Sequence, residues 1–235
     1  MPPCKDQIRG MFDGIAPQYD RLNHILSLGA DRSWRKRSLD AVVCPDRPQR
    51  ILDVACGTGD YSLAIARAMH PESRITAVDI SQGMLDIMKA KLLKNNLQDK
   101  VTAINADAQE LPFGDASFDC ACIAFGIRNF QDRRAALQEI GRVLGRGGKL
   151  VILELSLPEG RILRPLYKLA FRITAPLLGG LISGHREAYR YLPASVSEFP
   201  GKEEFMAFLG QCGYSGVAHK AFSFGACRMY TAVKD

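Results

Sequence analysis

The feature that most constrains the fold is a short apolar run that leads into a turn of small residues and then into a helical pattern. The run spans Arg50–Val54, the turn contains Gly57 and Gly59, and the helical pattern extends over about Asp60–Met69. Small residues let the backbone approach a ligand closely, and α/β folds bind their ligands at the ends of parallel strands. The segment therefore predicts an α/β sheet with a ligand site at this turn.

Short apolar runs continue to alternate with helical patterns, which is typical of a doubly wound sheet. Further strands are expected at Arg74–Val78, Val101–Asn105, Phe118–Ile123 and Lys149–Leu155, with a terminal pair near Val217–Ala221 and Arg228–Val233. Further helices are expected at about Gly83–Lys94, Arg133–Val143 and about Lys202–Cys212, and a glycine-rich turn around Gly145, Gly147 and Gly148. The pattern predicts a Rossmann-like sheet of seven strands that ends in a hairpin.

The length of 235 residues is enough for one substantial core and short for two. We therefore expect a single domain over residues 1–235. Residues 1–49 are interpreted as an N-terminal helical lid, with a proline-rich break at 44–48. Residues 158–200 interrupt the rhythm of strands and helices, so they are expected to form an insertion after the fifth strand that faces the substrate or a lipid.

Three aspartates end three successive predicted strands, at Asp53, Asp79 and Asp107. The glycine loop lacks the G-x-G-x-x-G spacing of dinucleotide sites, and an acid ahead of the turn suits a cationic amine or sulfonium better than a pyrophosphate. A carboxylate after the second strand can accept hydrogen bonds from both ribose hydroxyls. A lone aspartate at a strand end is more often a helix cap or a turn residue, but together these features indicate S-adenosylmethionine.

The predicted cofactor-binding residues lie on these three strand ends. They are Asp53, Gly57, Thr58, Gly59, Asp79, Asp107 and Ala108. Asp107 would accept a hydrogen bond from the adenine amine, and Ala108 would offer its backbone N–H. A seven-stranded Rossmann-like α/β sheet with this cofactor and a terminal hairpin is the class I methyltransferase fold.

The segment after the fourth strand disfavours one class of methylation target. It lacks the Pro-Pro pair with which many methyltransferases of this fold hold a planar target amine. The absence argues against methylation of nucleic-acid bases and favours C- or O-methylation of a small molecule.

The cysteines and the net charge say less about function than the motifs do. The seven cysteines are scattered, without a C-x-x-C pair or a cysteine–histidine cluster, so no metal site is predicted. This usage and the lack of a signal-peptide pattern favour a reduced, cytoplasmic protein. The net charge of +6 suits an anionic partner, such as a lipid surface or a phosphate-bearing ligand, without choosing among them.

Four segments resemble the ubiquinone/menaquinone biosynthesis C-methyltransferase family, and the resemblance extends from the N-terminal helix to the last strand. They are Ile15–Trp34, Phe125–Asn129, Arg142–Ser156 and Tyr191–Pro200. The first has Leu22 and Asp31 where the family usually has Met and His, and the third has Gly145-Arg146 in place of Lys-Pro. The compact length is closer to the bacterial menaquinone members.

The resemblance implies methylation of demethylmenaquinol to menaquinol, the last step of menaquinone biosynthesis. Loss of a hydroxyl proton makes the ring carbon of a naphthoquinol nucleophilic, and the reaction needs close positioning and stabilisation of the developing oxyanion. We expect Arg128 and Asn129 to stabilise this charge and Tyr19 to contact the substrate. His24 and His185 are possible proton acceptors, but either is more often a surface or packing histidine, and the sequence does not identify the acceptor.

Other functions stay open at this stage. A polyprenyl benzoquinol of ubiquinone biosynthesis, or another small phenolic or lipid substrate, would need similar chemistry. The chain could also be an inactive cofactor-binding subunit of a quinone-biosynthesis complex, which would need no catalytic residues. Nucleic acid is disfavoured as a partner, because the basic residues at 32 and 35–37 lack interleaved aromatic side chains.

A polyprenyl tail needs an apolar path, and Leu163–Ile182 is the longest apolar stretch of the chain. Arg164, Lys168 and Arg172 interrupt it, which excludes a transmembrane helix and is typical of an interfacial segment. We expect peripheral contact with the anionic inner face of a membrane. A helix that caps the core, or the face of a homodimer, would produce the same pattern.

Overall fold

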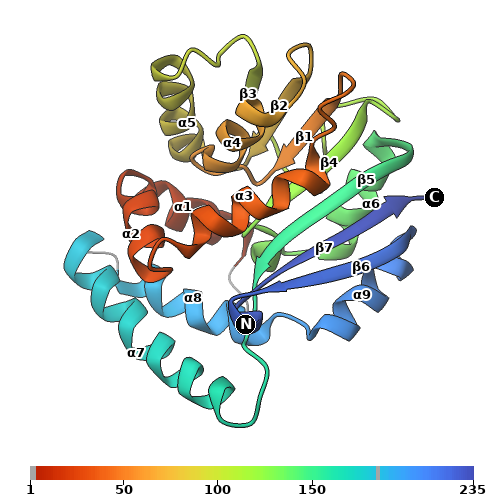
Figure 1. Cartoon of the computed structure of the whole chain (residues 1–235). Helices are drawn as coiled ribbons and strands as arrows, with labels where there is room; N and C mark the ends of the chain where they lie inside the picture. Colours follow the sequence, from red (N-terminus) through yellow and green to blue (C-terminus); the bar gives the residue numbers. More distant parts are fainter. Residues whose placement is uncertain (1–3, 184–185) are drawn as a thin grey trace.

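The computed structural model describes residues 4–183 and 186–235. In these residues, seven strands form one sheet in the order β3-β2-β1-β4-β5-β7-β6 (Figure 1). The strands are β1 (Arg50–Val54), β2 (Arg74–Asp79), β3 (Val101–Asn105), β4 (Phe118–Ala124), β5 (Leu144–Leu155), β6 (Tyr214–Phe222) and β7 (Cys227–Lys234). The seven-stranded α/β sheet predicted from the sequence is confirmed.

The strand pairing places a crevice between β1 and β4. Both strands are parallel to each other and to their outer neighbours β2 and β5, and β7 is antiparallel to β5 and β6. From β1 the chain first adds β2 and β3 on one side and then crosses to β4 on the other. Loops that leave the carboxyl ends of β1 and β4 therefore diverge, and the gap between them is where open α/β sheets bind ligands.

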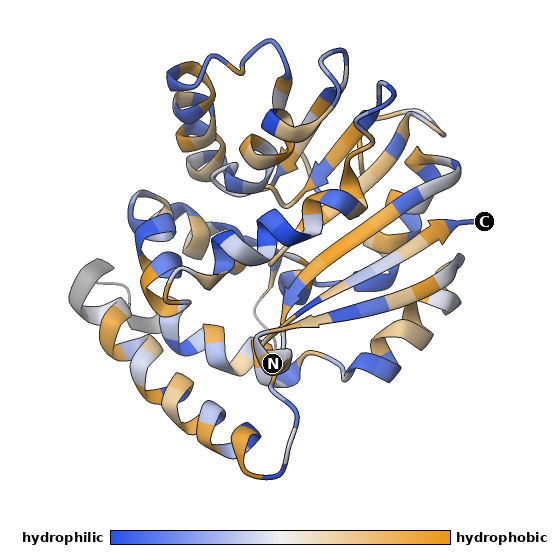
Figure 2. Ribbon diagram, in the orientation of Figure 1, coloured by the Kyte–Doolittle hydropathy of each residue, from blue (hydrophilic) through white to orange (hydrophobic). Residues whose placement is uncertain are grey.

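Helices cover both faces of the sheet. One face carries α3 (Ala30–Val42), α4 (Asp60–Ala68) and α5 (Gln82–Lys94), and the other carries α6 (Arg133–Val143) and α9 (Lys202–Gln211). Side chains alternate along β1, so Ile51 packs in the first layer and Leu52 in the second. Figure 2 shows the central strands as largely apolar, as expected for strands that are buried on both faces.

The strand β5 begins earlier than the sequence predicts. The segment with Gly145, Gly147 and Gly148, expected to be a turn before the strand, belongs to β5 and pairs with β4 through a shift in register. Gly147 has a φ of 73°, and a Cβ on Gly148 would lie 2.7 Å from the carbonyl oxygen of Gly145. The glycines form a bulge within the strand, because the ladder resumes on both sides of them.

The N-terminal helices and the insertion pack together beside the crevice. The chain starts with α1 (Lys5–Ile15) and α2 (Tyr19–Leu26), and the insertion forms α7 (Leu163–Ser183) and α8 (Arg186–Glu198) (Figure 1). A small apolar cluster joins these elements to α5, with Leu22 and Met84 fully buried in it. Among the described helices, none is both long enough and apolar enough to cross a membrane.

The glycine loop supplies a test of the fold. Gly59 has a φ of 84°, and a Cβ there would lie 2.5 Å from Cγ of the buried Met88. We expect Gly59→Ala to lower the free energy of unfolding by about 1–3 kcal/mol, since it combines backbone strain with overpacking. The exposed helical Gly210, with nothing within 4 Å of the same position, is the matched control. Gly210→Ala should raise stability by about 0.5–1 kcal/mol in the same urea titration. Equal effects of the two variants would contradict this account of the loop.

Candidate active site

A cavity of about 780 Å³ lies at the carboxyl ends of β1, β2 and β4. We call it the first cavity. Its wall includes residues predicted to bind the cofactor and two predicted to act on the substrate. The former are Gly57, Asp79, Asp107 and Ala108, and the latter are Tyr19 and Asn129. Among those at strand ends, the sheet brings together Gly57 and Asn129, which are 72 positions apart in the sequence.

Two residues in the wall of the first cavity hold left-handed backbone conformations although they carry side chains. Ala55 follows β1 with a φ of 54°, and Phe125 follows β4 with a φ of 62°. Next to Phe125, a Cβ on Gly126 would lie 2.6 Å from the Cβ of Ala55. Such strain costs about 1–3 kcal/mol per residue and is concentrated at ligand sites. The strained backbones and the close approach of the loops after β1 and β4 therefore indicate a ligand site in this crevice.

Asp79 ties the glycine loop to the end of β2. Its Oδ2 accepts a hydrogen bond of 2.8 Å from the backbone N–H of Gly57, and its Oδ1 accepts one of 2.9 Å from that of Ser81. Burial raises the pKa of Asp79, and the two N–H groups partly offset that rise. The carboxylate lines the first cavity, where the sequence places it.

Asp107 and Ala108 line the first cavity from the loop after β3. The Nζ of Lys5 lies 2.5 Å from Oδ2 of Asp107. Burial raises the pKa of Asp107, but the Lys5 ammonium and the N–H of Gln109 together lower it by more. The pKa of Asp107 is therefore below its ordinary value. Lys5, Ile8 and Phe12 of α1 complete this wall. The sequence predicts a helical lid here but not which of its residues reach the cavity.

Three predicted cofactor residues lie outside the wall of the first cavity. Asp53 is fully buried, and its carboxylate accepts a hydrogen bond from Ser62 of α4, with burial raising its pKa to about 7. Thr58 is also buried, and Gly59 packs against α5. Asp53, Thr58 and Gly59 therefore pack the glycine loop against the core rather than line the cavity.

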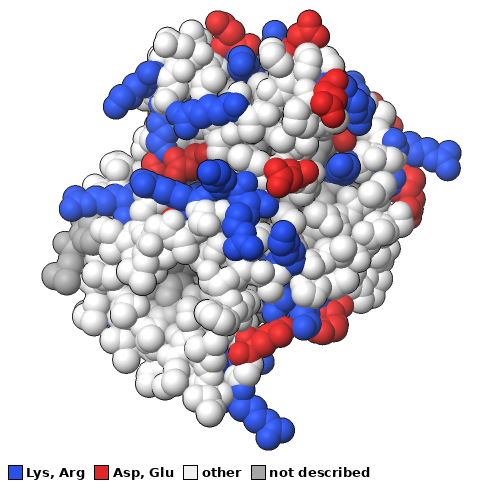
Figure 3. Space-filling model, in the orientation of Figure 1, with Lys and Arg blue, Asp and Glu red and all other residues white. Residues whose placement is uncertain are grey.

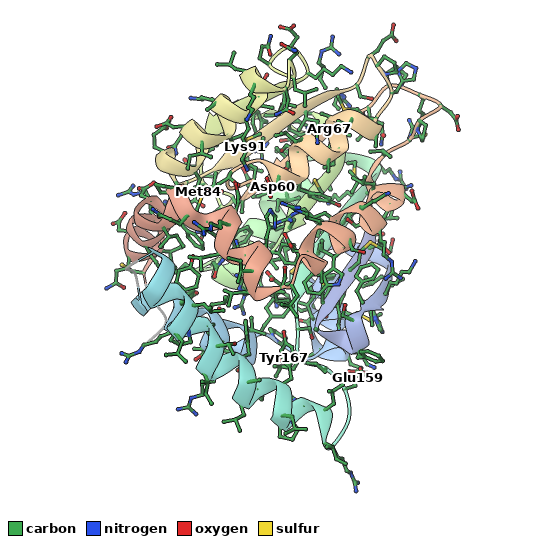
Figure 4. All side chains as sticks on the ribbon, turned by 60° about the vertical axis from the view of Figure 1, so that its left-hand side comes forward. Asp60, Arg67, Met84, Lys91, Glu159 and Tyr167 are labelled. Atoms are coloured by element: carbon green, nitrogen blue, oxygen red, sulfur yellow. The ribbon has the colours of Figure 1, made fainter. Side chains whose placement is uncertain are left out.

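A group of charges holds Thr58 in place. Its hydroxyl donates to Asp20 of α2 and accepts a hydrogen bond of 3.1 Å from Nζ of Lys91. Lys91 also pairs with Asp20 at 2.5 Å. Its ammonium lies 2.6 Å from the carboxylate of Asp60, which Figure 4 labels next to it. The glycine loop is thereby connected to both α2 and α5.

A second cavity, of about 520 Å³, adjoins the first. Tyr19 and Phe125 line both, so these two side chains form the shared wall. Trp34 and Tyr167 contribute further aromatic surface, the latter from α7 (Figure 4). The ring centroids of Trp34 and Phe125 are 6.2 Å apart. The guanidinium carbon of Arg35 lies 5.2 Å from the ring centroid of Phe125. The sequence did not predict this cavity.

Arg128 lies in the wall of the second cavity and is buried, with 7% of its surface exposed. Its Nη1 donates to Oε1 of the fully buried Glu154 at 2.6 Å and to the carbonyl of Phe125. Burial opposes the charge, yet the Glu154 carboxylate holds the pKa of Arg128 above its ordinary value. A surface position, which is the ordinary place for an arginine, is excluded.

Two buried polar atoms beside the crevice have no hydrogen-bond partner among the described residues. They are Nε of Arg128 and Oδ1 of Asn129. Asn129 faces the first cavity and Arg128 the second. Unpaired buried polar groups are costly, so atoms of this kind are expected to be satisfied by a ligand.

Of the two candidate proton acceptors, His24 and His185, the first lies near the second cavity. His24 lies behind the second cavity, with its Nδ1 at 2.7 Å from Oδ2 of Asp31. His185 lies outside the described residues. Within residues 4–183 and 186–235, no group of His, Cys, Asp and Glu side chains could hold a metal ion.

Asp79 supplies a binding test. We expect Asp79→Asn to weaken the binding of S-adenosylmethionine about 10- to 100-fold, because the amide cannot make the charge-assisted hydrogen bonds of the carboxylate. Isothermal titration calorimetry would measure this effect. Asp86→Asn, on the exposed surface of α5, is the matched control and should bind normally. Equal affinity of the two variants would exclude Asp79 from the binding site.

Comparison with known proteins agrees with this geometry. The chain resembles in fold a SAM-dependent methyltransferase from Thermotoga maritima described as a possible histamine N-methyltransferase. That match has a TM-score of 0.67 at 18% identity and covers 96% of this chain and 99% of the other. A phosphoethanolamine N-methyltransferase from Haemonchus contortus, solved with S-adenosyl-L-methionine, matches at a TM-score of 0.62 and 17% identity, over 85% of this chain and 52% of that one.

Sequence relatives are closer. The chain is 42% identical to a demethylmenaquinone methyltransferase of Bacteroides fragilis, over 97% of this chain and 93% of the relative. It is 43% identical to the ubiquinone/menaquinone biosynthesis C-methyltransferase UbiE of Geobacter sulfurreducens, over 97% of this chain and 89% of the relative. The model of the ubiE/COQ5 methyltransferase family matches residues 3–234, and the chain belongs to that family.

Proposed function

We propose that this chain transfers a methyl group from S-adenosylmethionine to the ring carbon of demethylmenaquinol, which yields menaquinol. The observation that carries the proposal is the pair of adjoining cavities with a shared wall of Tyr19 and Phe125. One cavity has the polar strand ends of a nucleoside site, and the other has aromatic walls and a buried arginine. The relatives named as demethylmenaquinone methyltransferases support this choice of substrate.

The first cavity suits the methyl donor. The Asp79 carboxylate would accept from the ribose hydroxyls, and Asp107 and Ala108 would bind the adenine edge. Oδ1 of Asn129, which lacks a partner among the described residues, is available to accept from the cationic amine. When bound, S-adenosylmethionine supplies an electrophilic methyl group on a sulfonium.

The second cavity suits the aromatic ring of the quinol. Arg128 stays charged because Glu154 is beside it, so it stabilises negative charge that develops on a ring oxygen. Burial raises the pKa of Tyr19, which keeps its hydroxyl protonated and able to donate to the same oxygen. The aromatic side chains of Trp34 and Phe125 would hold the ring in position for attack through the shared wall.

The reaction is tested with labelled S-adenosylmethionine and four acceptors in parallel. These are a reduced demethylnaphthoquinone, its oxidised form, a benzoquinol and tRNA. We expect label in the naphthoquinol and little in the oxidised form, which has no hydroxyl proton to lose. Mass spectrometry of the product would place the methyl group on a ring carbon. Label on oxygen, or in tRNA alone, would contradict the proposal, and label in the benzoquinol would widen the substrate range.

We further propose that α7 contacts an anionic membrane surface, from which the polyprenyl tail enters. One side of α7 packs inwards through the half-buried Tyr167 and Phe171 and the buried Ala175, and the outer side carries an apolar stripe. The stripe consists of Ile162, just before the helix begins, and of Leu166, Leu169, Ile173 and Leu177 within it, each between 51% and 75% exposed. Figure 3 shows the face over α7 as almost free of charged side chains.

Basic side chains lie next to the stripe. Lys168 and Arg172 of α7 and Arg190 of α8 line a groove between the two helices, which also includes Phe171 of the second cavity. The sequence of α7 contains no acidic residue. An apolar stripe beside a basic groove is complementary to an anionic lipid surface.

Substitution of the stripe tests this contact. Leu169→Gln/Ile173→Gln should weaken flotation with anionic vesicles by about tenfold or more, since two exposed side chains no longer enter the lipid. Leu93→Gln, at an apolar residue of α5 that is 65% exposed, is the matched control. Unchanged flotation would exclude the contact. If the double variant instead converts a dimer into a monomer, the stripe is a contact between copies of the chain.

A further inference from the structure

Two apolar side chains protrude from turns of the chain. Leu28, in the turn between α2 and α3, is 94% exposed, and Phe224, in the turn between β6 and β7, is 86% exposed. Among the large apolar side chains that the structure describes, these two are the most exposed. Single apolar residues are common at protein surfaces, so exposure alone would not mark a site.

Both turns also hold strained backbones. Leu28 has a φ of 52° and Phe224 a φ of 56°, and Ser223 beside it has a φ of 47°. This left-handed region is unfavourable for residues with a Cβ, and Gly or Asn usually occupies it. Leucine and phenylalanine at these positions therefore neither relax the backbone nor gain burial within the chain. Folding does not account for them, and strained residues of this kind are concentrated at functional sites.

The two turns border the second cavity. Ser27, next to Leu28, lines this cavity. Trp34 lines it as well, and its Nε1 donates a hydrogen bond of 3.0 Å to Oγ of Ser223. In Figure 1, the hairpin of β6 and β7 points with this turn towards α7 and α8. The two exposed side chains thus stand next to the cavity whose walls suit the quinol.

The turn with Phe224 also adjoins the stripe of α7. The N–H of Glu159, in the loop that leads into α7, donates a hydrogen bond of 3.3 Å to the carbonyl of Phe224. Ile162, the first residue of the stripe, follows in the same loop. Phe224 therefore lies beside the end of the stripe at which α7 begins.

Exposed basic side chains accompany both turns. The guanidinium carbon of Arg37 lies 4.6 Å from the ring centroid of Phe222, at the end of β6. Figure 3 shows Lys and Arg side chains in a band over α3, beside the nearly uncharged face over α7. Apolar side chains next to basic ones are complementary to an anionic lipid surface. The basic residues on α3 are Arg32, Lys36 and Arg37, and those around the start of α7 are Arg161 and Arg164.

Two acidic side chains beside the turns are already paired. Asp31, in the first turn of α3, lies 2.5 Å from Nη1 of Arg35. Glu159 lies 2.6 Å from both Nη2 of Arg228 and Nζ of Lys202. The exposed arginines and lysine around the turns therefore leave an excess of positive charge.

We infer that Leu28 and Phe224 insert into an anionic lipid surface and hold the second cavity against it, so that the quinol enters the cavity directly from the lipid. The inference rests on the proposed function for its substrate, and it extends the contact proposed for α7 to two further turns. Ser223 connects the inserted turn to the cavity through its hydrogen bond with Trp34. An entrance held at the lipid spares the polyprenyl tail contact with water.

A second copy of the chain fits these turns less well. An isologous contact between two copies brings the same patch of each together. The exposed basic side chains around Leu28 and Phe224 would then face those of the other copy and repel them. An anionic lipid surface neutralises the same charges.

The double variant Leu28→Asn/Phe224→Asn separates lipid binding from folding. Asn tolerates the left-handed backbone, so the variant should unfold at a urea midpoint no lower than that of the wild type. We expect its affinity for vesicles of phosphatidylglycerol and phosphatidylcholine to fall about tenfold or more in flotation, because two apolar side chains no longer enter the lipid. Leu93→Gln, on α5, is the control and should float as the wild type does.

Two results of this experiment would overturn the inference. One is equal flotation of the double variant and the wild type. The other is a change from dimer to monomer in sedimentation, because a second copy of the chain would then cover the turns.

Insertion of Phe224 can be measured directly, because Trp34 is the only tryptophan of the chain. In Trp34→Phe/Phe224→Trp, the emission should shift to shorter wavelength when these vesicles are added, and brominated acyl chains should quench it. The control Trp34→Phe/Leu93→Trp should show neither effect. If the emission of vesicle-bound Trp34→Phe/Phe224→Trp stays unquenched, Phe224 remains outside the lipid and the inference fails.

Methyl transfer distinguishes this inference from the proposed function. With a prenylated demethylnaphthoquinol in the vesicles, Leu28→Asn/Phe224→Asn should lower kcat/KM about tenfold or more. With a soluble quinol that has no tail, kcat/KM should stay as in the wild type, since neither residue lines a cavity. Equal loss on both substrates would mean that the turns act on the cavity and not through lipid, against the inference. If the wild type methylates neither quinol, the proposed function fails, while flotation and quenching still decide whether the turns enter lipid.

Discussion

The chain leaves β1 towards β2 and β3 and later crosses to β4, and the site depends on this reversal. Because β1 and β4 are parallel neighbours, the loops at their carboxyl ends diverge and leave a crevice. Asp79 then holds the glycine loop through the N–H of Gly57. The strained backbones of Ala55 and Phe125 follow directly on β1 and β4, and the pairing of these two strands holds the start of each loop in place.

The buried pair of Arg128 and Glu154 is the next level of organisation. Glu154 lies on β5 and Arg128 in the loop after β4, so the pair fixes that loop against the sheet. Removal of one partner from such a pair typically costs about 3–5 kcal/mol, because the other charge is left buried and unpaired. The same arginine lines the second cavity, so the pair that fixes this loop also forms part of the wall of that cavity.

Sequence patterns located the strands and much of the first cavity. Asp79, Asp107 and Ala108, which the sequence predicts to bind the cofactor, line the first cavity because parallel strands bring their carboxyl ends to one edge. Asp53 ends the same kind of strand, yet it lies in the core beneath α4, on the same side of β1 as Ile51. Side chains alternate along a strand, so position at the strand end does not decide which way a carboxylate points.

The sequence by itself determined the sheet, the glycine loop and the class of cofactor, because these depend on local periodicity and on which residues stand at the ends of successive strands. Only the tertiary structure decided the second cavity. Its walls come from α2, α3, the loop after β4 and the insertion, which pack together over more than 100 residues of separation. The pairing of His24 with Asp31 was decided in the same way. It depends on the angle at which α2 and α3 meet, which no local pattern records.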